Sequence, residues 1–331
     1  MTRTLDWDEV VQAATRAPSI HNTQPWRFTA VGDRLEVRFD PQRSLPVLDP
    51  THRQQVISCG VAVEFAVLAL RSRGHDVAVD AGAQDDPDHL ATVRVLGDRP
   101  GDDDERVLAA AIGARHTTRA PFLARDVPTD LLEQLQADAG GLGVWVADVS
   151  RDDAELVSVL LLERAEQAEA SDPAYRAELE AWLRTDPESA DGIPVDAVPV
   201  DDPAARPSNW LVRDFLVGRR TAHAAAPVAD DAPPPVVERP AVLLLGTMRD
   251  DRTAWVQAGR VLGRVLLRLT AAGLAASPMT QALDWPATRA RLTAELSLVG
   301  HPQMMLRLGW PSTPATTTGR RPVAEVLTTA D

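Results

Sequence analysis

The sequence predicts an α+β fold made of two similar layers of mixed sheet and helix, joined by two long interface helices. Helix-like apolar segments alternate with short strand-like runs along the 331 residues, and 44% of the residues are hydrophobic, enough to bury a sizeable core. Two of the helical segments also share a pattern, because the same spacing separates Gly60 from Gly74 and Gly259 from Gly273.

Turn and cap residues set the boundaries of these elements. The Gly32-Asp33 pair is typical of a hairpin turn, and Gly74 and Gly273 are placed to end helices. In the first part we expect helices over 5–16 and 55–73, strands over 26–31, 34–39 and 90–96, and a solvated acidic run over 102–105 before a short helix that ends near 113. In the second part we expect helices over 130–139, 153–170, 173–184, 254–272 and 286–296, and strands over 143–147, 242–246 and 303–308.

The matched glycine helices favour an internal duplication, in which one chain imitates a dimer. Each helix is followed later by a strand that ends in Leu-Gly, and apolar residues between the glycines correspond: Val63, Val67, Leu68 and Leu70 match Leu262, Leu266, Leu267 and Leu269. The alternative is that two buried helices share a period by chance. We expect two degenerate copies, over residues 1–112 and 113–331.

A proline-rich insertion interrupts the second copy at about 171–240. It holds eleven of the 26 prolines, so no single regular element can run through it. A long irregular insertion is either a disordered linker or a working loop. Its large apolar side chains, Trp182, Trp210, Leu211, Phe215 and Leu216, need something to pack on. We interpret it as a lid or clamp.

The composition excludes several functional classes. The formal net charge of −14 disfavours nucleic acid and anionic membranes as partners. The chain has no lysine, which excludes a Schiff-base enzyme and a Walker A phosphate loop. Its one cysteine, Cys59, forms no intrachain disulfide and is interpreted as core. We expect a cytoplasmic protein without a signal peptide or a transmembrane helix.

Common catalytic motifs are also missing from the chain. The seven histidines show no metal-ligand spacing. Neither Gly-x-Ser-x-Gly nor Gly-x-Gly-x-x-Gly occurs, so hydrolase and Rossmann sites lack support.

The most informative run is 17–28, where a predicted helix gives way to a strand through a loop bracketed by Pro18 and Pro25. The loop carries four hydrogen-bonding side chains: Ser19, His21, Asn22 and Gln24. Side chains of this kind could bind the edge of a flat heteroaromatic ligand that carries carbonyls and ring nitrogens. The alternative is a self-satisfied turn, with Asn22 in a left-handed cap and Ser19 capping a helix.

A second run, Arg115-His116-Thr117-Thr118-Arg119, follows the short helix that ends near 113. In an extended segment Arg115, Thr117 and Arg119 project to one side, where two guanidiniums and a hydroxyl make a good anion clamp. Arg320 and Arg321 near the C-terminus could join the same anion. The alternative is a surface arginine pair that neutralises nearby acids.

These motifs resemble those of the nitroreductase family. Residues 18–26 resemble its flavin-site loop, and Arg115-x-Thr117-x-Arg119 resembles its Arg-x-Ser-x-Arg phosphate and pyrimidine segment. Ala258-Gly259 with the leucines that follow resembles its central dimer-interface helix. Residues 277–281 fall where members line the isoalloxazine edge, and the C-terminal arginines fall where members place a basic phosphate contact. The resemblance covers most of the chain outside the insertion.

The order of the motifs resembles one branch of that family, the Acg-type proteins. Ordinary members begin with the arginine segment, and two chains dimerise to complete each flavin site. Here the Pro-Ser loop comes first and the arginine segment opens the second copy, and neither copy contains both. The resemblance implies a fused pseudo-dimer with a covering lid and one complete site per chain.

For the individual residues, the resemblance implies an FMN site. Arg115, with Arg320 or Arg321, would hold the phosphate, and Thr117 keeps the hydroxyl of the family's serine. Arg119 would lie near the N1–O2 edge, where positive charge stabilises the anionic reduced flavin. The loop residues expected to cover the ring are Pro18, Ser19, His21 and Asn22, and Gln24 of the same loop is also expected to bind the cofactor. The residues expected along the edge of the ring are Ser277, Pro278, Met279, Thr280 and Gln281, with the backbone N–H of Thr280 or Gln281 facing N5. The lysines of many relatives are absent.

The resemblance implies three candidate functions. The first is an oxidoreductase in which FMN takes hydride from NAD(P)H and passes electrons to a small acceptor such as a nitroaromatic or quinone; the flavin then needs no catalytic acid, base or nucleophile from the protein. The second is a protein that sequesters FMN beneath a lid that blocks the nicotinamide. The third is a flavin-dependent dehydrogenase or tailoring enzyme. We expect no nucleic acid or membrane partner, and either a monomeric pseudo-dimer or a weak homodimer.

Overall fold

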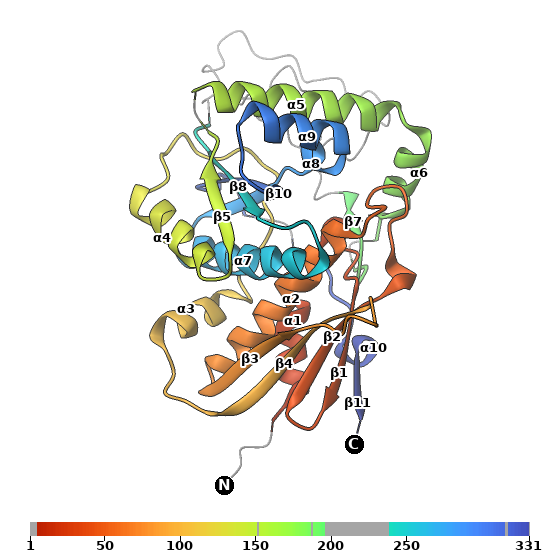
Figure 1. The fold of residues 1–331 in the computed structure, drawn as a ribbon, viewed down its shortest axis with the longest axis vertical. Helices are drawn as coiled ribbons and strands as arrows, with labels where there is room; N and C mark the ends of the chain where they lie inside the picture. Colours follow the sequence, from red (N-terminus) through yellow and green to blue (C-terminus); the bar gives the residue numbers. More distant parts are fainter. Residues whose placement is uncertain (1–4, 151, 187, 196–237, 315–316, 331) are drawn as a thin grey trace.

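The computed structural model describes residues 5–150, 152–186, 188–195, 238–314 and 317–330, and it contains two main sheets with a layer of helices between them (Figure 1). The first sheet has the order β11-β1-β2-β4-β3, formed by Leu327–Ala330, Trp26–Val31, Arg34–Phe39, His89–Asp98 and His75–Ala81. The second has the order β5-β8-β10-β9, formed by Val144–Asp148, Ala241–Thr247, His301–Gly309 and Ala275–Pro278.

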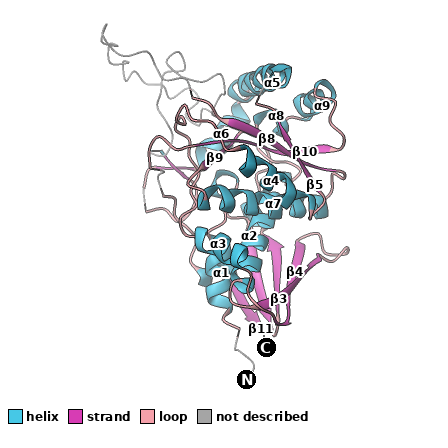
Figure 2. Cartoon of the chain, turned by 90° about the vertical axis from the view of Figure 1, so that its left-hand side faces the viewer, coloured by secondary structure: helices cyan, strands magenta, loops and turns pink. Residues whose placement is uncertain are grey.

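Helices fill the space between the sheets and cover the outer face of the second one. The inner layer contains α1 (Trp7–Thr15), α2 (Arg53–Arg71), α3 (Asp103–Ala111), α4 (Thr129–Gly140) and α7 (Arg252–Ala271). The outer layer contains α5 (Asp152–Ser171), α8 (Gln281–Asp284) and α9 (Pro286–Glu295), as two perpendicular views show (Figures 1 and 2). A short helix, α10 (Val323–Val326), precedes β11.

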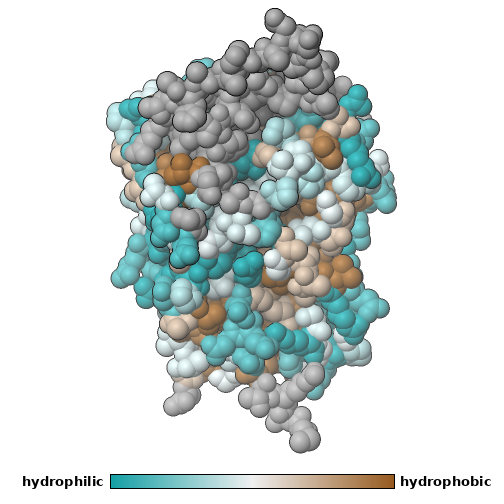
Figure 3. Space-filling model, turned by 180° about the vertical axis from the view of Figure 1, so that it is seen from behind, coloured by the Kyte–Doolittle hydropathy of each residue, from teal (hydrophilic) through white to brown (hydrophobic). Residues whose placement is uncertain are grey.

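This layering explains the apolar patterns of the strands. Every residue of β8 is buried, because Leu243 and Leu245 pack into the core between the sheets while Val242 and Leu244 pack beneath the outer helices. The first sheet is covered on one face only. Its strand β2 therefore alternates buried Leu35 and Val37 with more exposed polar residues. Seen from behind, much of the described surface is hydrophilic, with separate apolar patches (Figure 3).

The two sheets repeat one topology. The strands β1-β2-β4-β3 are antiparallel neighbours in that order, and so are β5-β8-β10-β9. In the chain α2 joins β2 to β3, and α7 joins β8 to β9 in the same way. The two glycine-containing helices, α2 and α7, thus occupy equivalent places in the two sheets. That both copies descend from one duplicated unit stays our interpretation.

The C-terminal strand breaks this correspondence. Strand β11 pairs in parallel with β1, with Phe28 beside Leu327, so the end of the second copy completes the sheet of the first. The two sheets are therefore not independent units, and the boundary between residues 112 and 113 stays a prediction.

Helices α2 and α7 cross at their glycines. A Cβ atom on Gly60 would lie 2.4 Å from the carbonyl oxygen of Val256, and one on Gly259 would lie 2.1 Å from that of Ile57. Beside this crossing the fully buried carboxylate of Glu64 accepts from Arg260 Nε at 2.9 Å and from Arg264 Nε at 2.5 Å. Backbone contact and a buried ion cluster therefore fix the two copies against each other.

Helix α2 is long and apolar enough to cross a membrane by length and composition alone. All of its apolar window is buried inside the protein. Its packing against α1, α7 and the first sheet explains the apolar sequence as that of a core helix, and Cys59 lies in this core as predicted.

Several predicted elements need correction. Strands β3, β9 and β11 and the helices α8 and α10 were not predicted: aspartates interrupt the apolar residues of β3, and each of the other four elements has only four residues. The acidic run is part of α3 rather than a segment before it: Asp102 caps the helix, and 103–105 form its first turn, where carboxylates favour the helix dipole. The predicted helix over 173–184 ends earlier, as α6 (Pro173–Ala181).

The described part of the insertion is anchored on the first copy. Residues after α6 form a small parallel pair, β6 (Leu183–Arg184) and β7 (Ile193–Pro194). Tyr175 and Leu179 of α6 pack on Leu45 and Leu48, and the carboxylate of Glu178 accepts from the backbone N–H groups of residues 47 and 48. The remainder of the predicted lid, with Trp210, Leu211, Phe215 and Leu216, lies outside the described residues.

The crossing predicts a large effect of Gly60→Ala. The new methyl group meets backbone rather than a movable side chain, so α2 and α7 must separate, and we expect the free energy of unfolding to fall by about 1–3 kcal/mol or more. Chemical denaturation measures this. The matched control is Gly140→Ala in α4, where no atom lies within 4 Å of the new methyl group and stability should hold or rise. Equal effects of the two substitutions would contradict a close crossing.

Candidate functional site

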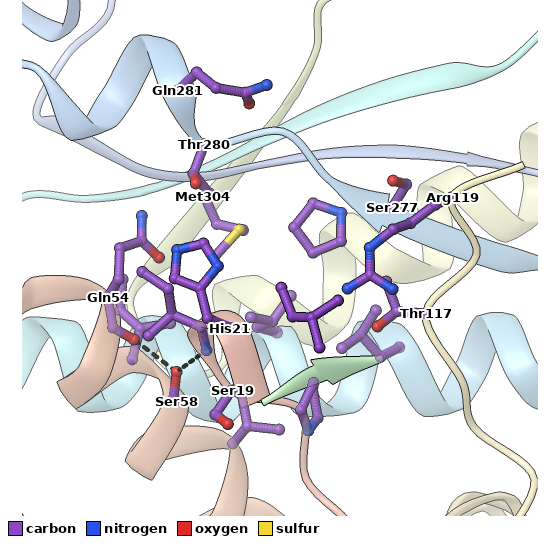
Figure 4. Close-up of a pocket in the computed structure, with 18 residues that line it drawn as sticks. Ser19, His21, Gln54, Ser58, Thr117, Arg119, Ser277, Thr280, Gln281 and Met304 are labelled. Carbon is purple, nitrogen blue, oxygen red and sulfur yellow. Dashed lines mark hydrogen bonds between the residues drawn. The ribbon is translucent and has the colours of Figure 1, made fainter. Parts of the chain in front are cut away.

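A cavity lies beside the helix crossing and is lined by both copies (Figure 4). It spans about 890 Å³, a volume that includes space open to solvent. Ile57 and Val61 of α2 and Leu262 and Leu266 of α7 give it an apolar wall. The wall is suited to a flat aromatic group because it offers apolar contact without competing hydrogen bonds.

The Pro-Ser loop reaches this cavity with Pro18, Ser19 and His21. His21, Asn22 and Gln24 have φ values of 46°, 54° and 50°, a left-handed conformation that costs non-glycine residues about 1–3 kcal/mol each. Hydrogen bonds hold the loop in this form: Ser19 Oγ accepts from the Gln24 N–H at 2.9 Å, and Ser58 Oγ on α2 accepts from the Ile20 N–H at 3.1 Å. The strained backbone aims His21 into the cavity.

Asn22 and Gln24 are not among the residues that line the cavity, although we expected Asn22 to cover the ligand ring and Gln24 to bind the cofactor. Asn22 Nδ2 donates to the carbonyl oxygens of Gly192 at 3.0 Å and Gly319 at 3.2 Å. Gln24 Nε2 donates to the carbonyl of Ala190 at 2.7 Å, and its Oε1 accepts from the Arg321 N–H at 2.8 Å. These two amides tie the loop to the insertion and to the C-terminal segment.

The arginine segment divides between the cavity and a neighbouring cluster. It runs beside β9, where Thr117 forms an isolated parallel β-bridge with Ala276. Thr117 and Arg119 line the cavity, and burial lowers the pKa of Arg119 to about 10. Arg115 is not part of the lining, so the predicted common side of the three residues is only partly realised.

Arg115 instead meets Arg16 and Arg320. The guanidiniums of Arg115 and Arg320 both donate to the carbonyl oxygen of Arg16, at 3.3 and 3.4 Å. Arg16 was not predicted, although its position at the end of α1, just before the Pro-Ser loop, could have indicated it. Arg321 turns away toward Asp40 and Glu325, with closest approaches of 3.8 and 3.5 Å. Arg320 is therefore the C-terminal arginine that joins the cluster.

The arginine cluster has positive charge that the described residues do not balance. Among them, no carboxylate pairs with Arg16, Arg115 or Arg320. The Nε and Nη1 atoms of Arg115 and the Nε of Arg320 are buried without hydrogen-bond partners. Burial, reinforced by Arg320 and Arg16, lowers the pKa of Arg115 to about 9. Buried donors of this kind, in so acidic a chain, indicate a site for an anion.

The segment 277–281 contributes four of its five predicted residues to the cavity lining: Ser277, Pro278, Thr280 and Gln281. Met279 is fully buried and packs instead in the core beneath the outer helices. Met279 comes directly after the end of β9, and its backbone N–H donates to the carbonyl oxygen of Met305 at 2.9 Å.

Sequence reasoning missed other lining residues. Gln54 and Ser58 come from α2, Met304 from β10 and Ile193 from the insertion. Ile193 is 1% exposed, so the described part of the insertion closes one side of the cavity. Gln54 could have been suspected as a polar residue in an apolar helix, whereas Ile193 had no signal in the sequence.

A buried polar network lies at the start of α2, next to the cavity. Arg53 donates to the carbonyl oxygens of Gln303 at 2.7 Å and Leu283 at 3.0 Å and pairs with Asp284 at 3.3 Å. Asp49 accepts from the Gln55 N–H at 2.9 Å. Burial raises the pKa of Asp49 to about 6, although that hydrogen bond and the charge of Arg53 oppose the shift.

Comparison with known proteins gives relatives that extend over nearly the whole chain. The chain is 35% identical over 325 residues to a Mycobacterium tuberculosis (strain ATCC 25618 / H37Rv) protein provisionally named an NAD(P)H nitroreductase, covering 96% of this chain and 90% of that one. It is 31% identical over 327 residues to the provisionally named NAD(P)H nitroreductase Acg of the same strain, covering 96% and 93%. No protein-family model matches the chain.

Two solved structures are also similar. One is a nitroreductase with bound FMN from Bacteroides fragilis NCTC 9343, with 15% identity and a TM-score of 0.39, covering 65% of this chain and 93% of that one. The other is a nitroreductase-like family protein from Bacillus cereus, with 14% identity and a TM-score of 0.38, covering 66% and 92%.

The lengths and identities of the sequence matches define the class of this protein: the chain belongs to the nitroreductase family and has its mixed α+β fold. Within that family it belongs with the Acg-type proteins, as the order of its motifs predicted.

The raised pKa of Asp49 predicts a loss of stability as the pH rises. Between about pH 4 and pH 6 the unfolded chain ionises this aspartate while the folded chain keeps it protonated. The contribution of Asp49 to the free energy of unfolding is therefore fully present at low pH and is lost as the pH rises through 6. This loss amounts to about 2–3 kcal/mol. Asp49→Asn should flatten the fall in unfolding free energy measured by denaturation from about pH 4 to pH 7. Asp85→Asn, at an exposed position, is the control. An unchanged profile in Asp49→Asn would refute the assignment.

Proposed function

We propose that this protein binds FMN and is an oxidoreductase that transfers electrons from NAD(P)H to a small aromatic acceptor. The observation that carries the proposal is the arginine cluster, with its unpartnered buried donors, beside an apolar cavity. FMN joins a phosphate to a flat heteroaromatic ring, so it matches a cationic pocket next to an apolar slot. The named activity of the Mycobacterium relatives supports the same function.

Each part of the site has a role in this proposal. Arg115, Arg320 and Arg16 hold the phosphate through charge-assisted hydrogen bonds. Arg119 places a positive charge beside the cavity, which favours a ligand group that gains negative charge. The apolar wall excludes water from the ring. Bound FMN supplies the hydride and electron chemistry itself, and the protein supplies binding, orientation and electrostatics.

The second candidate function, sequestration of FMN, is favoured by one observation. Residues 190–193 are held in place by Asn22 and Gln24, and by an ion pair of Asp191 with Arg43, while Ile193 borders the cavity. A fixed cover of this kind limits access for a bulky nicotinamide. The two functions differ in whether NAD(P)H reduces the bound flavin. A flavin-dependent dehydrogenase or tailoring enzyme has no observation that favours it here.

The phosphate role predicts a selective effect of Arg115→Gln. This variant loses a charged donor to the phosphate, so we expect its affinity for FMN to fall about tenfold or more, with little change for riboflavin, which lacks the phosphate. Equilibrium titrations followed by flavin fluorescence measure both affinities.

Arg321→Gln is the matched control, because this neighbouring arginine pairs with Asp40 and Glu325 and stands outside the cluster. It should bind FMN nearly as the wild type does. Equal losses for FMN and riboflavin in Arg115→Gln, or an equal loss in the control, would place the phosphate elsewhere.

A further inference from the structure

A buried carboxylate organises one end of the cavity. Asp284, at the end of α8, has a side chain 6% exposed and accepts from three donors. Arg53 lies 3.3 Å away, Gln54 Nε2 3.1 Å and Thr280 Oγ1 2.8 Å. Gln54 comes from α2 and Thr280 from the turn before α8, so the carboxylate joins the two copies. Both of these donors also line the cavity.

The hydrogen bonds to Asp284 decide what these side chains offer to a ligand. A threonine hydroxyl has a single hydrogen, and Thr280 directs it to Asp284, so its oxygen presents only lone pairs to any other group. A carboxylate only accepts, so the Gln54 atom that faces it must be the nitrogen. The Gln54 oxygen is then the end of the amide that remains for the cavity.

Gln281 repeats this arrangement with another acidic residue. Its Nε2 donates to Glu166 Oε2 of α5 at 3.0 Å, which again fixes the amide with its nitrogen toward a carboxylate. Gln54, Thr280 and Gln281 therefore share one feature: each lines the cavity and directs a hydrogen toward an acidic side chain. The two amides keep a second N–H, whereas Thr280 keeps none.

The opposite end of the cavity has the reverse character. Figure 4 shows Thr117, Ser277 and Arg119 together on one side and Gln54, Thr280 and Gln281 on the other. A guanidinium only donates hydrogen bonds. The cavity thus has a donor end at Arg119 and an acceptor-rich end near Asp284, and a ligand that matches both must carry its own donor at the second end.

From this polarity we infer that the acceptor-rich end selects a substrate ring that carries an N–H or O–H donor, such as an amino- or hydroxy-substituted quinone. A nitro group offers only acceptor oxygens, which Thr280 cannot bind, so a simple nitroaromatic is a poorer match. The inference rests on the proposed function, because it assigns this end of the cavity to the electron acceptor, whereas the family resemblance implied that Thr280 and Gln281 line the edge of the flavin ring. Asp284 is a positioning residue in this scheme, and Thr280 and Gln54 determine specificity.

Two matched naphthoquinones test this inference, one with a methylamino group and one with a dimethylamino group at the same carbon. They share a ring system, and only the first has an N–H. The protein is loaded with FMN, its loading is confirmed by the flavin absorbance, and each quinone is then titrated by calorimetry without reductant. One additional hydrogen bond predicts roughly threefold to tenfold tighter binding of the methylamino compound.

Variants at Thr280 assign the preference to this residue. Thr280→Ser keeps the hydroxyl and its hydrogen bond to Asp284, so it should keep the preference. Thr280→Val removes the hydroxyl oxygen and keeps a side chain of similar size, so it should reduce the ratio of the affinities for the methylamino and dimethylamino compounds. Because the same two compounds are compared in each protein, the extra methyl group of the dimethylamino compound cancels in this comparison.

The possible failures are distinct. A protein that retains no flavin refutes the proposed function before any quinone is added. A loaded wild type that binds the two quinones equally overturns the inference alone, and this comparison requires no variant. A full preference in Thr280→Val overturns the role of Thr280.

Discussion

The backbone contact between α2 and α7 at Gly60 and Gly259 is the constraint on which the site depends. It lets two long helices approach closely, so that Ile57 and Val61 of one and Leu262 of the other form a single apolar wall. The buried cluster of Glu64 with its two arginines adds an electrostatic contact that only this packing satisfies. Because the cavity lies between the copies, it exists only when both have folded against each other.

The arginine cluster, in contrast, destabilises the folded protein when no ligand is bound. Burial of several cations without carboxylates opposes folding by desolvation and mutual repulsion. Backbone carbonyls and the Asn22 amide oxygen, which accepts from Arg320 at 3.2 Å, hold these groups in place but do not neutralise them. An arrangement that an anion would relieve is what a phosphate-binding site requires before its ligand arrives.

The sequence predicted the parts of this fold that depend on local pattern. The hairpin strands 26–31 and 34–39 agree residue for residue, because their turn glycine and their alternation are both strong signals. The strand β9 and the C-terminal β11 were missed, since each has only four residues, and β11 also pairs with β1 at the other end of the chain. Tertiary pairing decides such strands, and their own sequence carries little information about it.

The predicted site shows the same division. Motifs predicted Pro18, Ser19, His21, Thr117 and Arg119 at the cavity, because those residues lie in short polar segments beside predicted elements. The directions of Asn22 and Gln24 depend on backbone strain and on the insertion, and that of Met279 depends on packing beneath the outer helices; no local pattern fixes these. Arg16 and Ile193 reach the site only through packing between distant segments.

The proposed function requires one flavin site that is shared by the two copies of the chain. The most direct measurement is the visible spectrum of purified protein that has been saturated with FMN, freed of excess and kept anaerobic, before and after addition of NADPH. We predict one bound flavin per chain and bleaching of its absorbance band by NADPH. A chain that retains no flavin, or two, would contradict the shared site, and a single retained flavin that NADPH leaves oxidised would contradict the oxidoreductase function and favour sequestration.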